Sequence, residues 1–329
     1  MRRLLPLLLL ARTAAGCRAA DAPASTNAWP VYLLAADANW LLEPPRKERF
    51  DASALLRLPD GTLLTVNDRG ADLYRIAFRD GTNVADLVPW PAAFTAAQLA
   101  PFAREKRQRY DAEGLARDGS GRLYLCEETD RWLLRWDPRG DTVERLAVDW
   151  SPVKRWFHPA DLNASFEGIA VGGGNLFVAN ERQTGRLLVL DLATLKVVDD
   201  FAVAPLGNTA KDTHYSDLCW AEDSLWVLLR DVRKILRVDP AARRVLAEFD
   251  YSTVERAPTW AYGAVYAPGF MEGMSVEPDA IWLVADNNGL GRRADLKDTR
   301  PTLFRCPRPD RMEPLSAGPG AAAPAPAAR

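Results

Sequence analysis

Histidine is scarce in this sequence, and the signatures of common enzyme centres are missing with it. The 329 residues include two histidines, His158 and His214, which is too few for most metal-hydrolase centres. The sequence contains no Gly-x-Ser-x-Gly elbow, no His-Glu-x-x-His motif, no phosphate-binding glycine loop and no dinucleotide fingerprint. His214 is the better candidate for acid/base work because it adjoins Asp217, although a structural role is the default for a single histidine.

A strong net charge is also absent. The sequence has 42 lysines and arginines against 44 aspartates and glutamates, for a formal net charge of −2. No basic stretch is dense enough to follow a phosphate backbone, which argues against nucleic acid as a partner. Past the first residues there is no apolar run of the ~20 residues that a membrane-spanning helix needs.

The first residues resemble an export signal. A basic start and a short apolar run over 4–11 precede Ala-Ala-Gly and Cys17. Small residues before a cysteine resemble the processing box of bacterial lipoproteins, in which that cysteine receives lipid. We therefore expect an exported protein that is periplasmic or anchored to the membrane only through a lipid on Cys17. Plain signal cleavage at Gly16 or Ala20 is the alternative.

The composition divides the chain into four parts. We expect a signal peptide over 1–16, a linker over 17–28 and one folded domain over 29–312. Residues 313–329 are mostly alanine, proline and glycine, so they cannot bury enough apolar surface to fold. We expect that last segment to be a disordered tail.

Five segments of the sequence align with one another. Each opens with a short apolar run, turns at a cluster of glycine, aspartate or proline, and continues with an apolar and aromatic run, which is typical of two paired strands. The segments begin near Asp51, Asp111, Ser165, Tyr215 and Phe270. A third apolar run follows in every copy, at 73–76, 133–136, 187–190, 235–238 and 303–306. A fourth follows in four copies, at 84–88, 143–148, 196–203 and 244–249.

Four strands in each of five copies predict an all-β fold, a β-propeller of five four-stranded blades. Six blades would need another module, for which the sequence has no segment. The fifth copy lacks its fourth strand, whereas Val31 to Ala36 is β-prone and precedes the first copy. We expect this N-terminal segment to complete the last blade, which closes the ring and removes an open edge.

Two columns of the repeat alignment are acidic. One lies at the start of the innermost strand and the other at the end of the strand beside it, so both reach the same mouth of the central channel. The first column holds Ser53, Glu113, Glu167, Asp217 and Glu272, and the second holds Asp68, Glu128, Glu181, Arg230 and Asp286. We therefore expect eight carboxylates to gather at that mouth.

Like charges this close cannot all stay ionised without compensation. Some carboxylates can protonate, arginines can pair with them, or a cation can bind. Calcium accepts about six to eight oxygen ligands in irregular geometry, whereas soft metals prefer the histidine and cysteine that the columns lack. The eight acids, with the side-chain oxygens of Asn67, Asn180 and Asn287, therefore favour a calcium site. The alternative is a ring of acids paired only with arginines, for which Arg69, Arg182 and Arg230 lie beside or within the columns.

Several repeat segments carry a family resemblance. They are Glu-Gly-Leu-Ala at 113–116, Phe-Glu-Gly-Ile-Ala at 166–170, His-Tyr-Ser-Asp-Leu at 214–218, Val-Ala-Asn-Glu-Arg at 178–182 and Val-Ala-Asp-Asn at 284–287. Over roughly 50 to 310 the chain resembles the SdiA-regulated propellers and the related domain named for the esterase-like activity of phytase. The resemblance implies an exported bacterial propeller that binds calcium, with ester or phosphoester hydrolysis as a family-level analogy. The first copy departs from the pattern with Ser53-Ala54, and the fourth with Asp217-Leu218 and Arg230. A cation site would therefore be lopsided.

Two hypotheses of function follow. The favoured one is a monomeric, non-catalytic binding or scaffold protein of the cell envelope, with a cation at the mouth and a small molecule or an envelope protein as its partner. The alternative is a calcium-dependent hydrolase of esters or phosphoesters, in which calcium polarises the ester oxygen. In that case Arg69, Arg182 or Arg230 would hold an anionic group, and His214 would be the acid/base candidate.

Overall fold

The computed structural model describes residues 29–102, 110–158, 161, 164–181, 185–209, 213–263 and 269–311. The expected signal peptide, the linker with Cys17, the C-terminal tail and Arg182 lie outside these residues. Among the helices of the described ranges, none has the length and apolar character needed to cross a membrane.

Short antiparallel strands make up most of the described chain. Their continuous apolar runs suit strands that are covered on both faces. One four-stranded sheet consists of β7 (Ala112–Arg117), β8 (Leu123–Glu127), β9 (Trp132–Asp137) and β10 (Thr142–Arg145). Another consists of β11 (Phe166–Gly172), β12 (Asn175–Asn180), β13 (Arg186–Asp191) and β14 (Val197–Phe201). The fold is therefore all-β, as the sequence predicts.

The other two sheets of the described ranges are larger. One contains β15 (Tyr215–Ala221), β16 (Ser224–Leu229), β17 (Lys234–Asp239), β18 (Arg244–Asp250) and, at its outer edge, β1 (Val31–Leu33). The last has eight strands in two four-stranded halves. Its halves are β3 (Ala52–Arg57), β4 (Leu63–Asn67), β5 (Leu73–Phe78) and β6 (Val84–Pro89), and then β19 (Met271–Val276), β20 (Ala280–Ala285), β21 (Thr302–Pro307) and β2 (Ala38–Glu43). Parallel pairing of β2 with β6 joins these halves at the rim.

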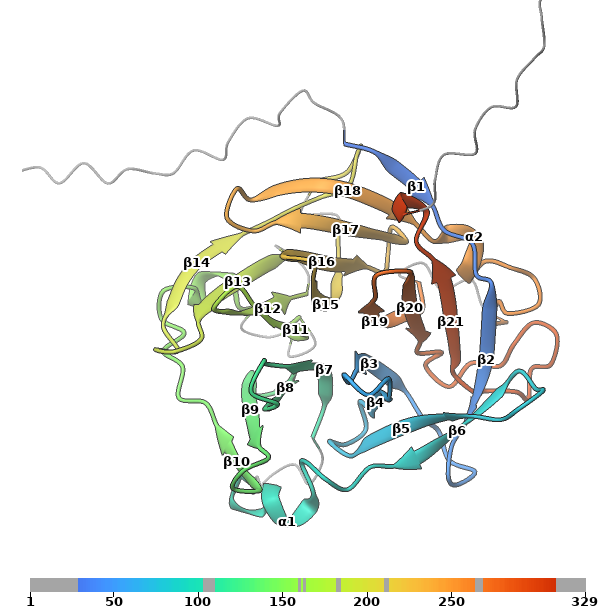
Figure 1. Cartoon of the computed structure of the whole chain (residues 1–329), viewed down its shortest axis with the longest axis horizontal. Coiled ribbons are helices and arrows are strands. Elements are labelled where there is room, and N and C mark those ends of the chain that lie inside the picture. The colour runs from blue at the N-terminus through green and yellow to red at the C-terminus, as the bar shows by residue number, and fades with distance from the viewer. Residues whose placement is uncertain are drawn as a thin grey trace, which may run out of the picture.

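The first strand of each four-stranded unit lies at the centre of the molecule. The strands β3, β7, β11, β15 and β19 contact one another in this order, and β19 returns to β3, so they form a closed ring (Figure 1). The remaining strands extend outward from this ring, which is the arrangement of a β-propeller. Because every inner strand begins on the same side of the ring, the first residues of all of them surround one mouth of the channel.

The strand that completes the last unit differs from the expected one. The pairing of Val31–Leu33 is parallel to β18, whereas Ala38–Glu43 pairs antiparallel with β21. The prediction that Val31 to Ala36 completes the last sheet is therefore wrong by one segment. The two strands also differ in burial, because Leu42 in β2 is 0% exposed while Leu33 in β1 is 71% exposed.

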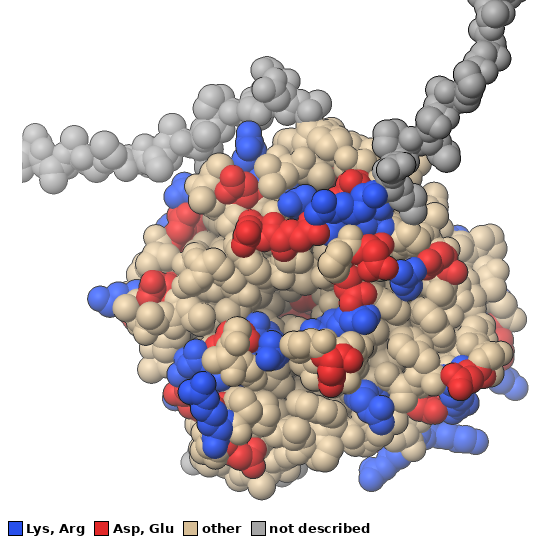
Figure 2. Space-filling view, viewed as in Figure 1, with Lys and Arg blue, Asp and Glu red and all other residues tan. Residues whose placement is uncertain are grey.

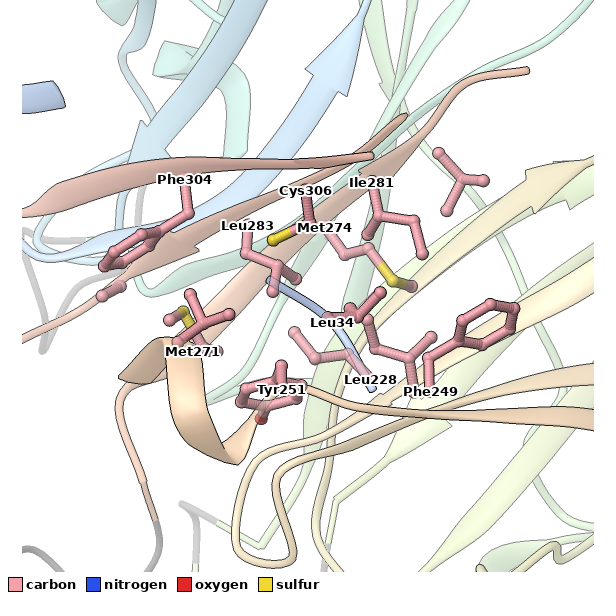
Figure 3. Close-up of a cluster of buried hydrophobic side chains, with 14 of the residues drawn as sticks. Leu34, Leu228, Phe249, Tyr251, Met271, Met274, Ile281, Leu283, Phe304 and Cys306 are labelled. Carbon is pink, nitrogen blue, oxygen red and sulfur yellow. The ribbon is translucent and has the colours of Figure 1, made fainter. Parts of the chain in front are cut away.

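Apolar side chains pack between neighbouring sheets. Figure 3 shows one such cluster, in which Leu228 and Phe249 face Met274, Ile281 and Leu283 of the following sheet. Leu34, which follows β1, inserts into the same cluster. This close packing fixes the sheets relative to one another and makes the ring a rigid support for the residues at its mouth.

A small cavity lies among the inner strands, toward the end opposite the acidic columns. The cavity measures about 60 Å³ and is lined by residues of all five inner strands, including Leu56, Arg117, Val171, Trp220 and Ser275. Figure 2 shows one face of the molecule, on which acidic and basic side chains are interspersed around a central hollow.

Candidate metal centre at the channel mouth

A β-bulge sets the direction of the first acidic column. In every inner strand the register slips after the first paired residue. A bulge leaves the extra residue unpaired in the ladder and re-aims its side chain. The residues between the shifted pairs are Ser53, Glu113, Glu167, Ser216 and Glu272. Four of the five residues that the sequence alignment placed in the first column therefore lie at the bulge.

Asp217 is the exception, and its alignment with that column is wrong by one residue. The alignment matched carboxylate to carboxylate, whereas the strand pairing gives the bulge position to Ser216. Asp217 is 1% exposed and accepts hydrogen bonds from the backbone N–H groups of Leu218 (2.8 Å) and Met274 (2.7 Å). Burial raises its pKa well above the ordinary value. Its side chain thus ties β15 to β19 and does not belong to either acidic cluster described below.

Residues of the second column follow directly after the second strand of each unit. The backbone N–H of Asp68 donates to the carbonyl of Asp51 (3.0 Å), and that of Glu128 donates to the carbonyl of Asp111 (2.9 Å). The N–H of Glu181 donates in the same way, to Ser165 at 2.8 Å. These bonds extend the ladder by one residue and hold each acid beside the start of an inner strand.

Six carboxylates gather into two clusters. The oxygens of Asp68, Asp111 and Glu113 lie within 4.8 Å of one another, and so do those of Glu128, Glu167 and Glu181. We call these the first and the second acidic cluster. Each combines a second-column acid of one unit with a first-column acid of the next. Asp111 was not among the predicted site residues, although it precedes Glu113 by two positions.

Three acids of the clusters, Asp68, Glu113 and Glu167, have raised pKa values. Burial, together with the charges of Asp51, Asp286 and Asp111, raises the pKa of Asp68 to about 8. Burial and the charges of Glu167 and Glu128 raise the pKa of Glu113 well above its ordinary value. The pKa of Glu167 is also raised, first by burial and then by Glu181 and Glu128. The charges of acids from both clusters raise the pKa of Glu113, so the two clusters interact electrostatically through this residue.

Arg230 and His214 both lie next to Glu181 of the second acidic cluster. The guanidinium of Arg230 forms an ion pair with Glu181 (Nη2 to Oε1, 2.8 Å) and a second one with Glu272. The Nδ1 atom of His214 lies 3.8 Å from the same Oε1 of Glu181. The mouth therefore contains arginine-paired carboxylates beside two clusters rich in acids.

The remaining predicted acid lies near a third group of charges. Asp286 is buried, and burial followed by the charge of Asp51 raises its pKa to about 7. Asp51 forms ion pairs with Arg49 (2.6 Å) and Arg69 (3.7 Å). Arg69 thus contacts an acid of the mouth, while the predicted candidate Arg182 lies outside the described residues.

The donor set suits a hard cation. All six ligand candidates of the two clusters offer carboxylate oxygens, which Mg²⁺, Ca²⁺ and Mn²⁺ prefer. Of the predicted asparagines, Asn67 accepts hydrogen bonds through its side-chain oxygen from the backbone N–H groups of Asp51 and Arg69. The side-chain oxygen of Asn287 accepts the N–H of Gly289 in a local turn. Asn180, next to Glu181, is fully buried and its side-chain oxygen has no hydrogen-bond partner among the described residues.

One solved structure supports the architecture, and a second shows a weaker likeness. Glutaminyl cyclase from Myxococcus xanthus is similar with a TM-score of 0.57 and 17% identity, over 85% of this chain and 97% of that chain. Virginiamycin B lyase from Staphylococcus aureus gives a TM-score of 0.39 and 11% identity over 78% of this chain and 66% of that one. The first likeness supports the propeller fold.

Sequence comparison identifies the family. A comparison with curated proteins found no match. The family model described as phytase-like, "esterase-like activity of phytase", matches residues 51–289, which include every inner strand and both acidic clusters. The chain therefore belongs to the phytase-like family.

Proposed function

We propose that this protein is a five-bladed propeller that binds divalent cations, calcium first among them, at the acidic mouth and serves there as a non-catalytic binding protein. The observation that carries this proposal is the gathering of six carboxylates into two clusters with oxygens within 4.8 Å of one another. The five blades correspond to the five inner strands and their four-stranded units.

The electrostatics of the clusters is compatible with a bound cation. The pKa values of Asp68, Glu113 and Glu167 are raised because burial and neighbouring acids disfavour their charged forms. A bound divalent cation reverses both effects, since it supplies the opposite charge and takes the place of water as a ligand partner. Calcium tolerates the irregular arrangement that acids from different blades create, whereas magnesium requires near-octahedral ligands.

Hydrolysis of esters or phosphoesters is the second candidate, favoured by the family description and by His214 and Arg230 beside Glu181. In that case the cation would polarise the ester oxygen and His214 would move a proton. Arg230, however, already pairs with two carboxylates, so its charge is neutralised before any anionic substrate arrives. We therefore favour the binding role. Calcium-dependent cleavage of a nitrophenyl ester or phosphate that is lost in His214→Ala would favour the enzyme instead.

The proposal is tested by thermal melting in chelator, in magnesium and in calcium. Calcium at a hundredfold excess over its dissociation constant adds about 2.7 kcal/mol to the free energy of unfolding. We expect calcium to raise the melting temperature more than magnesium does, and Glu167→Gln to reduce that rise. Glu144→Gln, an exposed change on β10, is the matched control and should respond like the wild type. A melting temperature indifferent to chelator and calcium would end the proposal.

We further propose that the protein acts outside the cytoplasm, as the N-terminal sequence indicates, with a small molecule or an envelope protein as the partner at the mouth. If Cys17 carries lipid, the wild type should fractionate with membranes and Cys17→Ser should be released. Equal solubility of both forms would leave ordinary signal cleavage as the route of export.

A further inference from the structure

Neighbouring blades repeat one arrangement at the mouth. The second-column residue of each blade lies next to the first-column residue of the blade that follows, and we call each such pair a slot. Around the ring the slots hold Asp68 with Glu113, Glu128 with Glu167, Glu181 with Ser216, Arg230 with Glu272, and Asp286 with Ser53. The slots share one backbone geometry, so the difference between them lies in the side chains.

The first two slots contain two acids each and form the core of the two acidic clusters. The fourth slot contains an acid and a guanidinium instead. Arg230 contacts Glu272 within this slot and also Glu181 of the preceding blade, so its positive charge lies between two carboxylates. A guanidinium keeps its charge at any pH at which the protein folds. It therefore compensates these carboxylates as a divalent cation would compensate those of the first two slots.

Burial makes Glu272 dependent on this charge. Glu272 is 4% exposed, and its Oε2 atom has no hydrogen-bond partner among the described residues. An ionised carboxylate in such a place is costly unless an opposite charge accompanies it. Removing the guanidinium would leave a buried acid, and a second acid in Glu181, facing the space that the guanidinium had filled.

We propose that Arg230 is a tethered counter-ion that fills a third cation position of the mouth and so restricts divalent cations to the two acidic clusters. The inference rests on the proposed function and names the residue that determines how many cations the mouth accepts. Through Glu181, which belongs to the second acidic cluster, Arg230 also withdraws negative charge from that cluster. A neutral residue in its place opens the third position and strengthens the second cluster as a cation site.

The test is the number of calcium ions that bind to the purified protein, measured by isothermal titration and by equilibrium dialysis with radioactive calcium. Arg230→Gln should bind one more calcium ion per chain than the wild type does. It should also melt at a lower temperature in chelator and gain more from calcium. Arg230→Lys keeps the charge and should retain the wild-type number. Arg69→Gln removes an arginine elsewhere at the mouth and should likewise retain it.

A double variant identifies the ligand of the extra ion. Arg230→Gln with Glu272→Gln removes the charge pair together and should return to the wild-type number of ions. The inference would be overturned if Arg230→Gln bound the same number of calcium ions per chain as the wild type. It would also be overturned if Arg230→Gln stayed unfolded in both chelator and calcium. If the wild type binds no calcium while Arg230→Gln binds one ion, the proposed function fails and the role of Arg230 stands. If the wild type binds calcium and Arg230→Gln gains no ion, the proposed function stands and the role of Arg230 fails.

Discussion

The carboxylate of Asp217 in β15 accepts a hydrogen bond from the backbone N–H of Met274 in β19, over 2.7 Å, and joins two inner strands of the ring directly. Its other oxygen accepts the N–H of Leu218. On its other side β15 lies close against β11, because a Cβ added at Gly168 of β11 would lie 2.6 Å from the Cα of Asp217. The ring just inside the mouth is therefore tightly packed and hydrogen-bonded, and it positions the acids that the bulges direct outward.

Asp217→Ala tests this connection. We expect it to lower the free energy of unfolding by about 1–3 kcal/mol, because it leaves buried N–H groups without their acceptor. Alanine fits the position sterically, since Ala54 occupies the equivalent site of β3. The measurement is unfolding in urea, with the exposed change Asp80→Ala as control. Equal stability of the two variants would show that the carboxylate contributes nothing to the ring.

Gly168→Ala should also destabilise the protein, for a steric reason. The new methyl group would meet backbone atoms of Asp217 and Leu218 at 2.6–2.8 Å, so two strands of the ring would have to move apart. Overpacking of this kind costs about 1–3 kcal/mol or more. Gly119→Ala is the matched control, because a Cβ there would meet nothing within 4 Å. A neutral Gly168→Ala in denaturant unfolding would contradict the close approach of β11 and β15.

Closure of the last blade by β2 predicts unequal effects of two leucine truncations. Leu42→Ala removes a side chain that is fully buried between the joined halves of the eight-stranded sheet, and should cost about 2–5 kcal/mol. Leu33→Ala, in the exposed β1, should stay within about 0.5 kcal/mol of the wild type. Thermal or urea unfolding decides between the two strands, and the reverse order would restore the first N-terminal segment as the closing strand.

The overall architecture could be predicted from the sequence because each repeat carries several signals at once. The third apolar runs all lie within strands, β5, β9, β13, β17 and β21, and four short strands in each repeat leave few alternatives to a propeller. The closing strand was misidentified, because Val31–Leu33 is richer in β-prone residues than Ala38–Glu43. Their burial depends on which edge each strand meets.

The outline of the site could be predicted from the sequence, but the alignment of one strand was shifted by one residue. The two acidic columns pointed to the mouth because residues at equivalent places in a repeat converge in a ring. Asp217 was misplaced because the alignment matched carboxylate to carboxylate, whereas the bulge that all five inner strands share gives that position to Ser216. Arg230 was recognised as a departure from the pattern, but its pairing with two acids on different blades depends on the three-dimensional arrangement.

Without cations the protein should lose stability as the pH rises. The pKa of Asp68 is raised from 3.8 to about 8 in the folded state, and that of Asp286 from 3.8 to about 7. At a pH between 3.8 and these raised values, the folded state therefore binds more protons than the unfolded state. Their contribution is complete below the unfolded pKa and is lost as the pH rises through about 7 to 8. We expect the melting temperature in chelator to fall from about pH 5 to about pH 8, and Asp68→Asn to make the fall shallower. A melting temperature that rises over this range would contradict the sign.

Direct calcium titration at neutral pH tests the central claim, that the acidic mouth is a cation site built from acids of neighbouring blades. The wild type should bind calcium with proton release, since the raised pKa values of Asp68, Glu113 and Glu167 leave protons for the cation to displace. Asp68→Asn with Glu113→Gln should abolish binding at the first acidic cluster, and Glu128→Gln with Glu167→Gln at the second. The account would be contradicted if the wild type showed neither heat nor proton release on addition of calcium. It would also be contradicted if both double variants gave the same heat and proton release as the wild type.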